Sequence, residues 1–138
     1  MRRVLEAAVK QFDWKPTRAP SNQGIGIACG TWYKTCVATV VQVKVDKSTG
    51  KVQVERVATA VDAGIIVNPE GARQQVEGCV SMGLGYALSE EVRFSNGEIL
   101  DKNFDTYEIH ASRRCRRSRL FWSTIRNWLP MGSPNHRP

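Results

Sequence analysis

Two apolar segments separated by a short polar turn constrain the fold most strongly. Residues 37–45 and 52–61 alternate or run apolar and are rich in β-branched side chains, a composition that favours strands. The residues between them have the sequence DKSTGK, which supplies Asp, Ser and Gly for a turn. The pattern therefore predicts an antiparallel hairpin over residues 37–61 that turns at residues 46–50.

The second strand leads through a glycine turn into a glycine-interrupted helix. Residues 60–64 (AVDAG) close the strand, and the pair Asn68-Pro69 is typical of a helix start. Apolar residues then recur at every fourth position from Val76 to Leu88. Glycines interrupt this helix at positions 71, 78, 83 and 85. Each costs about 1 kcal/mol relative to Ala, so their number indicates that another backbone or a ligand approaches closely.

Three further elements complete the expected fold. Residues 2–12 carry a helical apolar stripe and predict a short amphipathic helix, and residues 25–27 open a strand. Residues 91–94 and 98–100 flank Asn96-Gly97, a two-residue turn that predicts a second hairpin. The expected fold class is α+β, with antiparallel β-hairpins packed with a Gly-rich helix.

Charge divides the chain into two parts. Residues 1–109 hold 13 Lys and Arg against 13 Asp and Glu, so the net charge of +7 lies wholly in residues 110–138. That stretch has seven Arg and no acidic residue, a break that usually marks a tail of separate origin or role. We therefore divide the chain into a partial domain, 1–109, and an anomalous Arg-rich tail, 110–138.

Other classes of protein find little support. The four cysteines lie 7, 43 and 36 positions apart, which matches no metal or redox spacing and predicts no disulfide framework. No apolar run reaches the length of a membrane-spanning helix, and no signal peptide follows the first basic residues. Secretion is therefore not indicated.

The ordered motifs of residues 1–109 resemble those of one enzyme family. They are, in chain order, GIGIA at 24–28, the hairpin at 37–61, VDAG at 61–64, the Asn-Pro pair, QQVEG at 74–78, GLG at 83–85, LSEE at 88–91 and NFDTY at 103–107. This series is similar to the molybdenum-binding large subunit of the xanthine dehydrogenase and aldehyde oxidase family, in particular to isoquinoline 1-oxidoreductase-like members. The resemblance covers a small piece of such a protein, so the fold is expected to be part of a molybdopterin-binding domain.

The resemblance assigns one residue to a cofactor. Gln75 matches the Gln of the family's Q-V-E-G element, which hydrogen-bonds the pterin of the molybdenum cofactor, and an amide can donate and accept at once. From the residues alone, Gln75 could instead cap or crosslink the helix start, and Glu77 is expected to brace the helix N-terminus. Glu90 and Glu91 are interpreted as a solvated turn, because adjacent side chains point in different directions. No catalytic residue and no metal ligand is assigned.

The function implied by the resemblance is that of a molybdenum hydroxylase, an oxidoreductase that hydroxylates N-heterocycles or aldehydes with oxygen from water. Molybdopterin is the implied cofactor of the full-length protein, and none is expected on this fragment alone. The implied partners are a small-molecule substrate, an iron–sulfur small subunit and the upstream half of the large subunit. The compartment stays open between cytoplasm and periplasm. Because the family's catalytic Gly-Glu-Pro motif does not occur in the chain, we expect the chain to be inactive alone.

The tail after Ile109 departs from the family, which continues with Pro-Arg, an apolar residue and Leu-Pro before a strand. In a frame shifted by one nucleotide, the codons of residues 109–134 can encode Pro-Arg-Phe, Leu-Pro, Ile-Glu, Val-Leu, Asn-Pro-Glu-Leu and Gly-Glu-Pro in this order. Three shifted codons allow a single residue, and each fits: Leu from Phe121/Trp122, Leu from Asn127/Trp128 and Gly from Met131/Gly132. The hypothesis is that one nucleotide was lost near codon 109, in the gene or in its sequencing.

The tail also allows a function of another class. Its arginines, with Trp122 and Trp128, could combine phosphate contacts with base stacking, which makes a nucleic-acid or acidic-surface binding protein the alternative. A true binder would carry basic residues on its folded part as well, whereas residues 1–109 are formally neutral. On the frameshift hypothesis, residues 113–119, with five Arg, are instead expected to be disordered or poorly packed.

Overall fold

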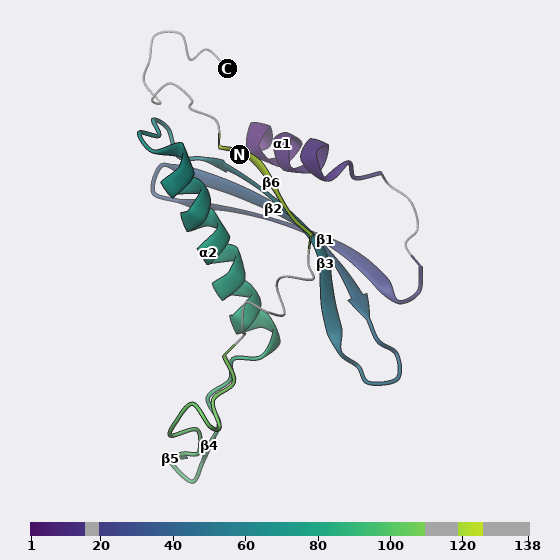
Figure 1. Cartoon of the computed structure of the whole chain (residues 1–138), viewed down its shortest axis with the longest axis vertical. Coiled ribbons are helices and arrows are strands. Elements are labelled where there is room, and N and C mark those ends of the chain that lie inside the picture. Colours follow the sequence, from purple (N-terminus) through teal and green to yellow (C-terminus); the bar gives the residue numbers. More distant parts are fainter. Residues whose placement is uncertain (16–19, 110–118, 126–138) are drawn as a thin grey trace.

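The computed structural model describes residues 1–15, 20–109 and 119–125, the last of these as backbone alone. Within these ranges two helices and six strands follow one another (Figure 1). In chain order they are α1 (Arg2–Phe12), β1 (Gln23–Trp32), β2 (Thr35–Val45), β3 (Val52–Asp62), α2 (Pro69–Leu88), β4 (Phe94–Ser95), β5 (Glu98–Ile99) and β6 (Arg119–Ile125).

The predicted antiparallel hairpin is confirmed: β2 and β3 pair residues 36–45 with residues 52–62. In its turn, the Asp46 carboxylate accepts hydrogen bonds from the Ser48 hydroxyl at 2.6 Å and the Ser48 amide at 2.9 Å. These bonds lower the pKa of Asp46 to about 2, because they stabilise its charged form. Gly50 has a φ of 71°, a left-handed conformation that glycine adopts without steric cost. The turn therefore lies where its sequence places it.

A β-bulge aligns the apolar residues of the hairpin. The register shifts after Gln42, so that Glu55 of β3 lies outside the pairing, and the Gln42 amide donates to the Glu55 carboxylate at 3.2 Å. Because of the extra residue, Val54 and Val57 face the same side of the sheet, and both are buried. The bulge thus accommodates a strand that is not strictly alternating.

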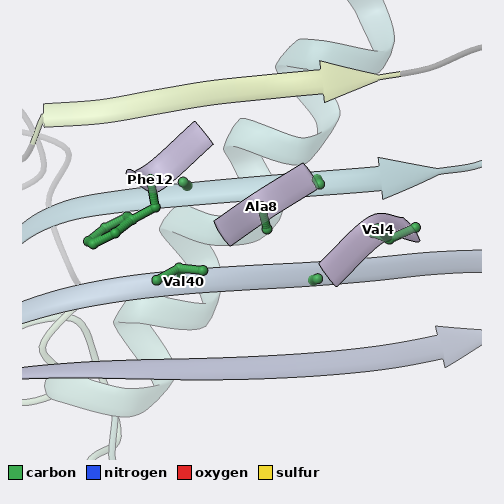
Figure 2. Packing of buried hydrophobic residues seen from close by; sticks show 7 residues of the cluster. Val4, Ala8, Phe12 and Val40 are labelled. Carbon is green, nitrogen blue, oxygen red and sulfur yellow. The ribbon is translucent and has the colours of Figure 1, made fainter. Parts of the chain in front are cut away.

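The core lies between α1 and the middle of the sheet. Val4, Ala8 and Phe12 project from one face of α1, and Figure 2 shows them above β2 and β3. The sheet residues beneath them are small or β-branched: Ala38, Val40, Ala58 and Ala60. Alanines let the helix backbone approach the sheet closely. The predicted helix over residues 2–12 is confirmed, and it supplies about half of this core.

Arg56 ties the end of α1 to the sheet. Its guanidinium lies 4.4 Å from the centroid of the Phe12 ring, a cation–π geometry. The same group donates a hydrogen bond to the Phe12 carbonyl at 2.9 Å, an acceptor that the helix leaves without an intrahelical partner. One side chain thus covers the ring and satisfies the helix C-terminus.

The sheet has the order β1-β2-β3-β6, and β6 pairs with β3 in parallel. The prediction of a tail without regular packing was made for residues 113–119. Arg119 instead begins β6, while residues 113–118 lie outside the described part of the chain. The physical reason is that the edge of β3 offers main-chain hydrogen bonds to any extended segment, and LFWSTI at 120–125 is rich in aromatic and β-branched residues.

The Gly-rich helix begins at Pro69, as predicted, but it contributes less to packing than expected. Figure 2 shows α2 behind the sheet, on the face opposite α1. Among its residues only Gly85 is fully buried. The predicted α+β class is confirmed, yet the helix that builds the core with the hairpin is α1, because its stripe meets the small residues of the sheet.

The second hairpin is also confirmed, in a shorter form. β4 and β5 pair Phe94 with Ile99 and Ser95 with Glu98. Asn96 and Gly97 form the turn between them with φ values of 50° and 82°, as a type I′ turn requires.

In the described residues, no helix combines the length and the apolar character needed to cross a bilayer.

The core geometry predicts that Phe12→Ala destabilises the chain by about 3–5 kcal/mol, because it removes a buried ring and leaves a cavity. Urea unfolding followed by circular dichroism measures the loss. Ile65→Ala is the matched control, since Ile65 is 69% exposed and should change the stability little. Equal effects of the two substitutions would contradict the assigned core.

Candidate cofactor-binding site

The start of α2 is fixed by a side-chain cap. The Asn68 carboxamide oxygen accepts a hydrogen bond from the Gly71 amide at 3.0 Å, and Pro69 occupies the first helical turn, where its missing N–H costs nothing. A Cβ added at Gly71 would lie 3.0 Å from Nδ2 of Asn68, so glycine leaves room for the cap. The cap fixes where every later residue of the helix points.

Gln75 lies on the outward face of this helix. It is exposed, and its amide contacts the Cys79 sulfur at 3.9 Å, a weak interaction. The alternative that Gln75 caps the helix start is wrong, because Asn68 holds that position. Its carboxamide therefore remains accessible to a polar ligand.

The residues around Gln75 form an open, weakly polar surface, which we call the Gln75 face. The members of the Gln75 face, which share the exposed side of α2, are Gln75, Gly78, Cys79, Met82 and Tyr86. A neighbouring stripe of the helix is half-buried, at Ala72, Val76, Val80 and Leu84, which recur at helical spacing. The helix thus has a half-buried stripe and an exposed Gln75 face.

Two glycines of α2 have unfilled space above them. A Cβ built at Gly78 or at Gly83 would meet no atom within 4 Å. At Gly78 and Gly83, the close approach that the glycines predicted is therefore not made by the described residues. The Gln75 amide can both donate and accept hydrogen bonds, and Gly78 beside it has no side chain. This combination fits the polar edge of a flat heterocycle such as a pterin.

Ion pairs flank the helix start and exclude one expected role. Arg73 contacts Glu70 and, with Nη1, the Glu77 carboxylate at 3.1 Å. The prediction that Glu77 braces the helix N-terminus is therefore wrong, because its partner is a side chain one turn earlier. The hydrogen bond from Arg73 lowers the pKa of Glu70. Pairs this exposed contribute little to stability.

The end of α2 is held by Tyr107. The Tyr107 hydroxyl donates to the Glu90 carboxylate at 2.9 Å, which raises the pKa of Tyr107, because losing the proton would place two negative charges together. Glu90 is half-buried and Glu91 exposed. The solvated-turn interpretation is thus wrong for Glu90. The pairing spans 17 residues, which no local sequence pattern indicates.

A buried carboxylate fixes the loop between these two residues. Asp101 has a fully buried side chain and accepts from the Arg93 amide at 2.6 Å and from Nη2 of the same residue at 2.6 Å. The Arg93 side chain lowers the pKa of Asp101, because a nearby cation favours the charged carboxylate. Arg93 and Asp101 together anchor the β4–β5 hairpin to the segment that carries Tyr107.

Metal-ligand chemistry is not evident in the described part of the chain. No group of three or more His, Cys, Asp or Glu residues there could hold a metal ion. Cys29, Cys36 and Cys79 are free thiols, while Cys115 and both histidines lie outside the described residues.

The Arg93–Asp101 pair predicts an acid-sensitive loop. A carboxyl whose pKa is lowered in the folded protein stabilises the fold at pH values above its unfolded pKa. That stabilisation is lost as the pH falls through the folded pKa, which for Asp101 lies below the usual 3.8. Arg93→Gln should raise the Asp101 pKa toward its usual range and move acid unfolding of residues 93–101 to higher pH. Arg93→Lys should lie between, because it keeps the charge and loses the bidentate contact. A carboxyl NMR titration checks this, and an unchanged Asp101 pKa in Arg93→Gln would exclude it.

Comparison with known proteins identifies the domain. Residues 3–115 match the family described as the molybdopterin cofactor-binding domain. Curated relatives include the membrane-bound aldehyde dehydrogenase [pyrroloquinoline-quinone] of Gluconacetobacter polyoxogenes, 36% identical over 75% of this chain and 14% of the relative. The isoquinoline 1-oxidoreductase subunit beta of Brevundimonas diminuta is 32% identical over 77% of this chain and 14% of its own length.

A third relative and a solved structure are also similar to this chain. A probable xanthine dehydrogenase subunit from Bacillus subtilis (strain 168) is 42% identical over 71% of this chain and 12% of its own length. The crystal structure of Cu,Mo-CO dehydrogenase in its carbon monoxide reduced state is similar in fold, with a TM-score of 0.58 at 20% identity over 65% of this chain and 11% of that one. The chain spans about one seventh or less of these proteins. It belongs to the molybdopterin cofactor-binding domain family, as part of a molybdopterin-binding subunit of the xanthine dehydrogenase type.

Proposed function

We propose that this chain is part of a molybdenum hydroxylase that hydroxylates an N-heterocycle or an aldehyde with oxygen from water. The match of residues 3–115 to the cofactor-binding family carries the proposal. Relatives named for aldehydes, isoquinoline and nicotinate support the substrate class. The chain's own contribution would be a cofactor-binding surface rather than the reacting groups.

Within that surface, Gln75 would hold the pterin. Its carboxamide is exposed and has no strong hydrogen bond to give up, since its side-chain contact is the Cys79 sulfur at 3.9 Å. A pterin edge alternates donors and acceptors, and one amide can satisfy a pair of them. The bound cofactor supplies the redox chemistry, and Gln75 would orient it. The Asn68 cap and the Tyr107–Glu90 hydrogen bond would keep the helix in place at its two ends.

Three carboxylates near α2 are paired with other side chains and do not offer a general base. Glu77 pairs with Arg73, Glu90 accepts from Tyr107, and the Asp101 side chain is buried against Arg93. A general base must lie within about 3 Å of the proton that it takes and be free to accept it. These three carboxylates are engaged with other side chains, so none of them is free to act as the base. The Gly-Glu-Pro motif, absent from the sequence, would supply the base.

The missing motif follows from the proposed frameshift near codon 109. In the shifted frame, the codons of residues 131–134 can encode Gly-Glu-Pro. In the same frame, the codons of residues 117–122 can encode Ile-Glu and Val-Leu, at positions that overlap β6. The match to the family ends at Cys115, shortly after Ile109. Resequencing tests the proposal: an intact single frame would exclude it.

Partners are proposed on the same basis. The relatives are named as subunits, and large apolar side chains are open at one end of the sheet, where β2 begins beside the end of β3. Tyr33 between β1 and β2 is 93% exposed, and Val67 before α2 is 94% exposed. The remaining large subunit would cover this end, and an iron–sulfur subunit would accept the electrons.

The alternative, nucleic-acid binding through the basic tail, has one supporting observation, the seven Arg of residues 110–138. On the described body, Arg2, Arg73 and Arg93 each pair with a carboxylate, so these cations build no basic surface. Removal of residues 110–138 discriminates the two functions. Salt-dependent DNA binding that persists without the tail would favour the alternative.

We predict that Gln75→Ala weakens molybdopterin retention in the frame-restored, full-length protein. Loss of one hydrogen bond costs about 0.5–1.5 kcal/mol, or roughly 2- to 10-fold in affinity. Molybdenum and pterin content after dialysis measure it. Gln74→Ala is the matched control, because Gln74 is also exposed on α2 but lies off the Gln75 face. Equal retention by both variants would remove Gln75 from the site.

The 138-residue chain alone should retain no molybdopterin, even when folded. Cofactor affinity is distributed over many hydrogen bonds, and this chain supplies one of them. Metal analysis of the purified chain, with circular dichroism to establish folding, checks this expectation. Stoichiometric molybdenum on the isolated chain would show that the division of the site is misassigned.

A further inference from the structure

Among the residues that the structure describes, the outer edge of β1 carries none of the features that normally prevent strand pairing. β1 is the first strand in the sheet order, so β2 is its neighbour on one side only. Its ten residues, QGIGIACGTW, include no charged residue and no proline. The register with β2 runs from Gln23 to Trp32 without a bulge. Edge strands are usually protected by charges, prolines, bulges or a covering element.

The face of β1 beside α1 is apolar and only partly covered. Ile27 pairs with Val40, a residue of the core beneath α1, so Ile25, Ile27 and Cys29 lie on that side of the sheet. Figure 2 shows α1 across β2 and β3, with β1 running outside it. Ile25 remains 38% and Ile27 40% exposed. Apolar area is thus available at the open edge.

The sequence of β1 is self-complementary about Ile27. In an antiparallel pair of two copies centred on this residue, Ile27 faces Ile27, and Ile25 faces Cys29. On the other side of the sheet, Gly24 would face Gly30 and Gly26 would face Ala28. One face thus joins apolar side chains, and the other joins small ones that cannot clash. Cross-strand apolar pairs stabilise antiparallel sheets.

We propose that the open edge of β1 is an interface for a second copy of this chain. Two β1 strands pair antiparallel about a twofold axis through Ile27 and join the two sheets into one. A twofold interface requires a surface complementary to itself, and the pattern around Ile27 has this property. The absence of charge along β1 means that the second copy brings no repulsion to the edge.

The test is the mass of the full 138-residue chain in solution at micromolar concentration. We expect twice the 15.5 kDa of one chain by light scattering. Ile27→Lys should return the mass to that of one chain, because a single substitution places two ammonium groups opposite each other. Ile65→Lys is the matched control, since Ile65 is exposed in a loop before α2, and it should stay dimeric. Circular dichroism establishes that both variants fold.

A second variant tests the register without depending on a disruptive change. Ile27→Cys should form a disulfide between two copies under mild oxidation, because the self-paired position brings the sulfurs together. Ile65→Cys carries the same native thiols and should cross-link far less. A monomeric wild-type chain, a dimer that survives Ile27→Lys, or equal cross-linking of the two cysteine variants would each overturn the proposal.

Discussion

The contact between α1 and the small residues of β2 and β3 is the interaction on which the rest of the structure depends. Ala38, Ala58 and Ala60 leave space that Phe12 and its neighbours on α1 fill, and close packing makes each methyl group count. Arg56 then covers the Phe12 ring and donates a hydrogen bond to the Phe12 carbonyl at the C-terminus of α1. A hairpin of two strands is marginal by itself, and α1 buries one face of it, while Val57 and Thr59 are buried on the other face.

The helix that carries the candidate site is positioned differently. Its outward face is open, and specific contacts at its ends take the place of a deep core: the Asn68 cap at the start and the Tyr107–Glu90 hydrogen bond at the end. Such contacts contribute roughly 1 kcal/mol each, far less than a buried aromatic ring. The fold therefore separates the two tasks, with the buried ring on α1 and the proposed cofactor contact on α2.

Most of the local structure could be predicted from the sequence, because its causes are local. Asp46, Ser48 and Gly50 determine a turn within five residues, and Asn96-Gly97 determines another. The Asn68-Pro69 pair determines a helix start. The contacts of Glu90 with Tyr107 and of Arg93 with Asp101 join residues 17 and 8 positions apart, and no periodicity marks them. Gln75 was assigned by resemblance, and the structure adds only that its amide is accessible. β6 was not predicted, because it pairs with the edge of β3, and that edge exists only once the sheet has assembled.

The glycines of α2 link the fold to the proposed function. Gly78 and Gly83 each cost about 1 kcal/mol of helix propensity relative to Ala, yet a Cβ at either position would meet nothing among the described residues. Gly71 differs, since a Cβ there would crowd the Asn68 cap. Residues that cost stability without a local benefit favour an explanation outside the helix itself. Because Gly78 is one helical turn from Gln75, a cofactor held by that amide would lie over the position where the side chain is missing.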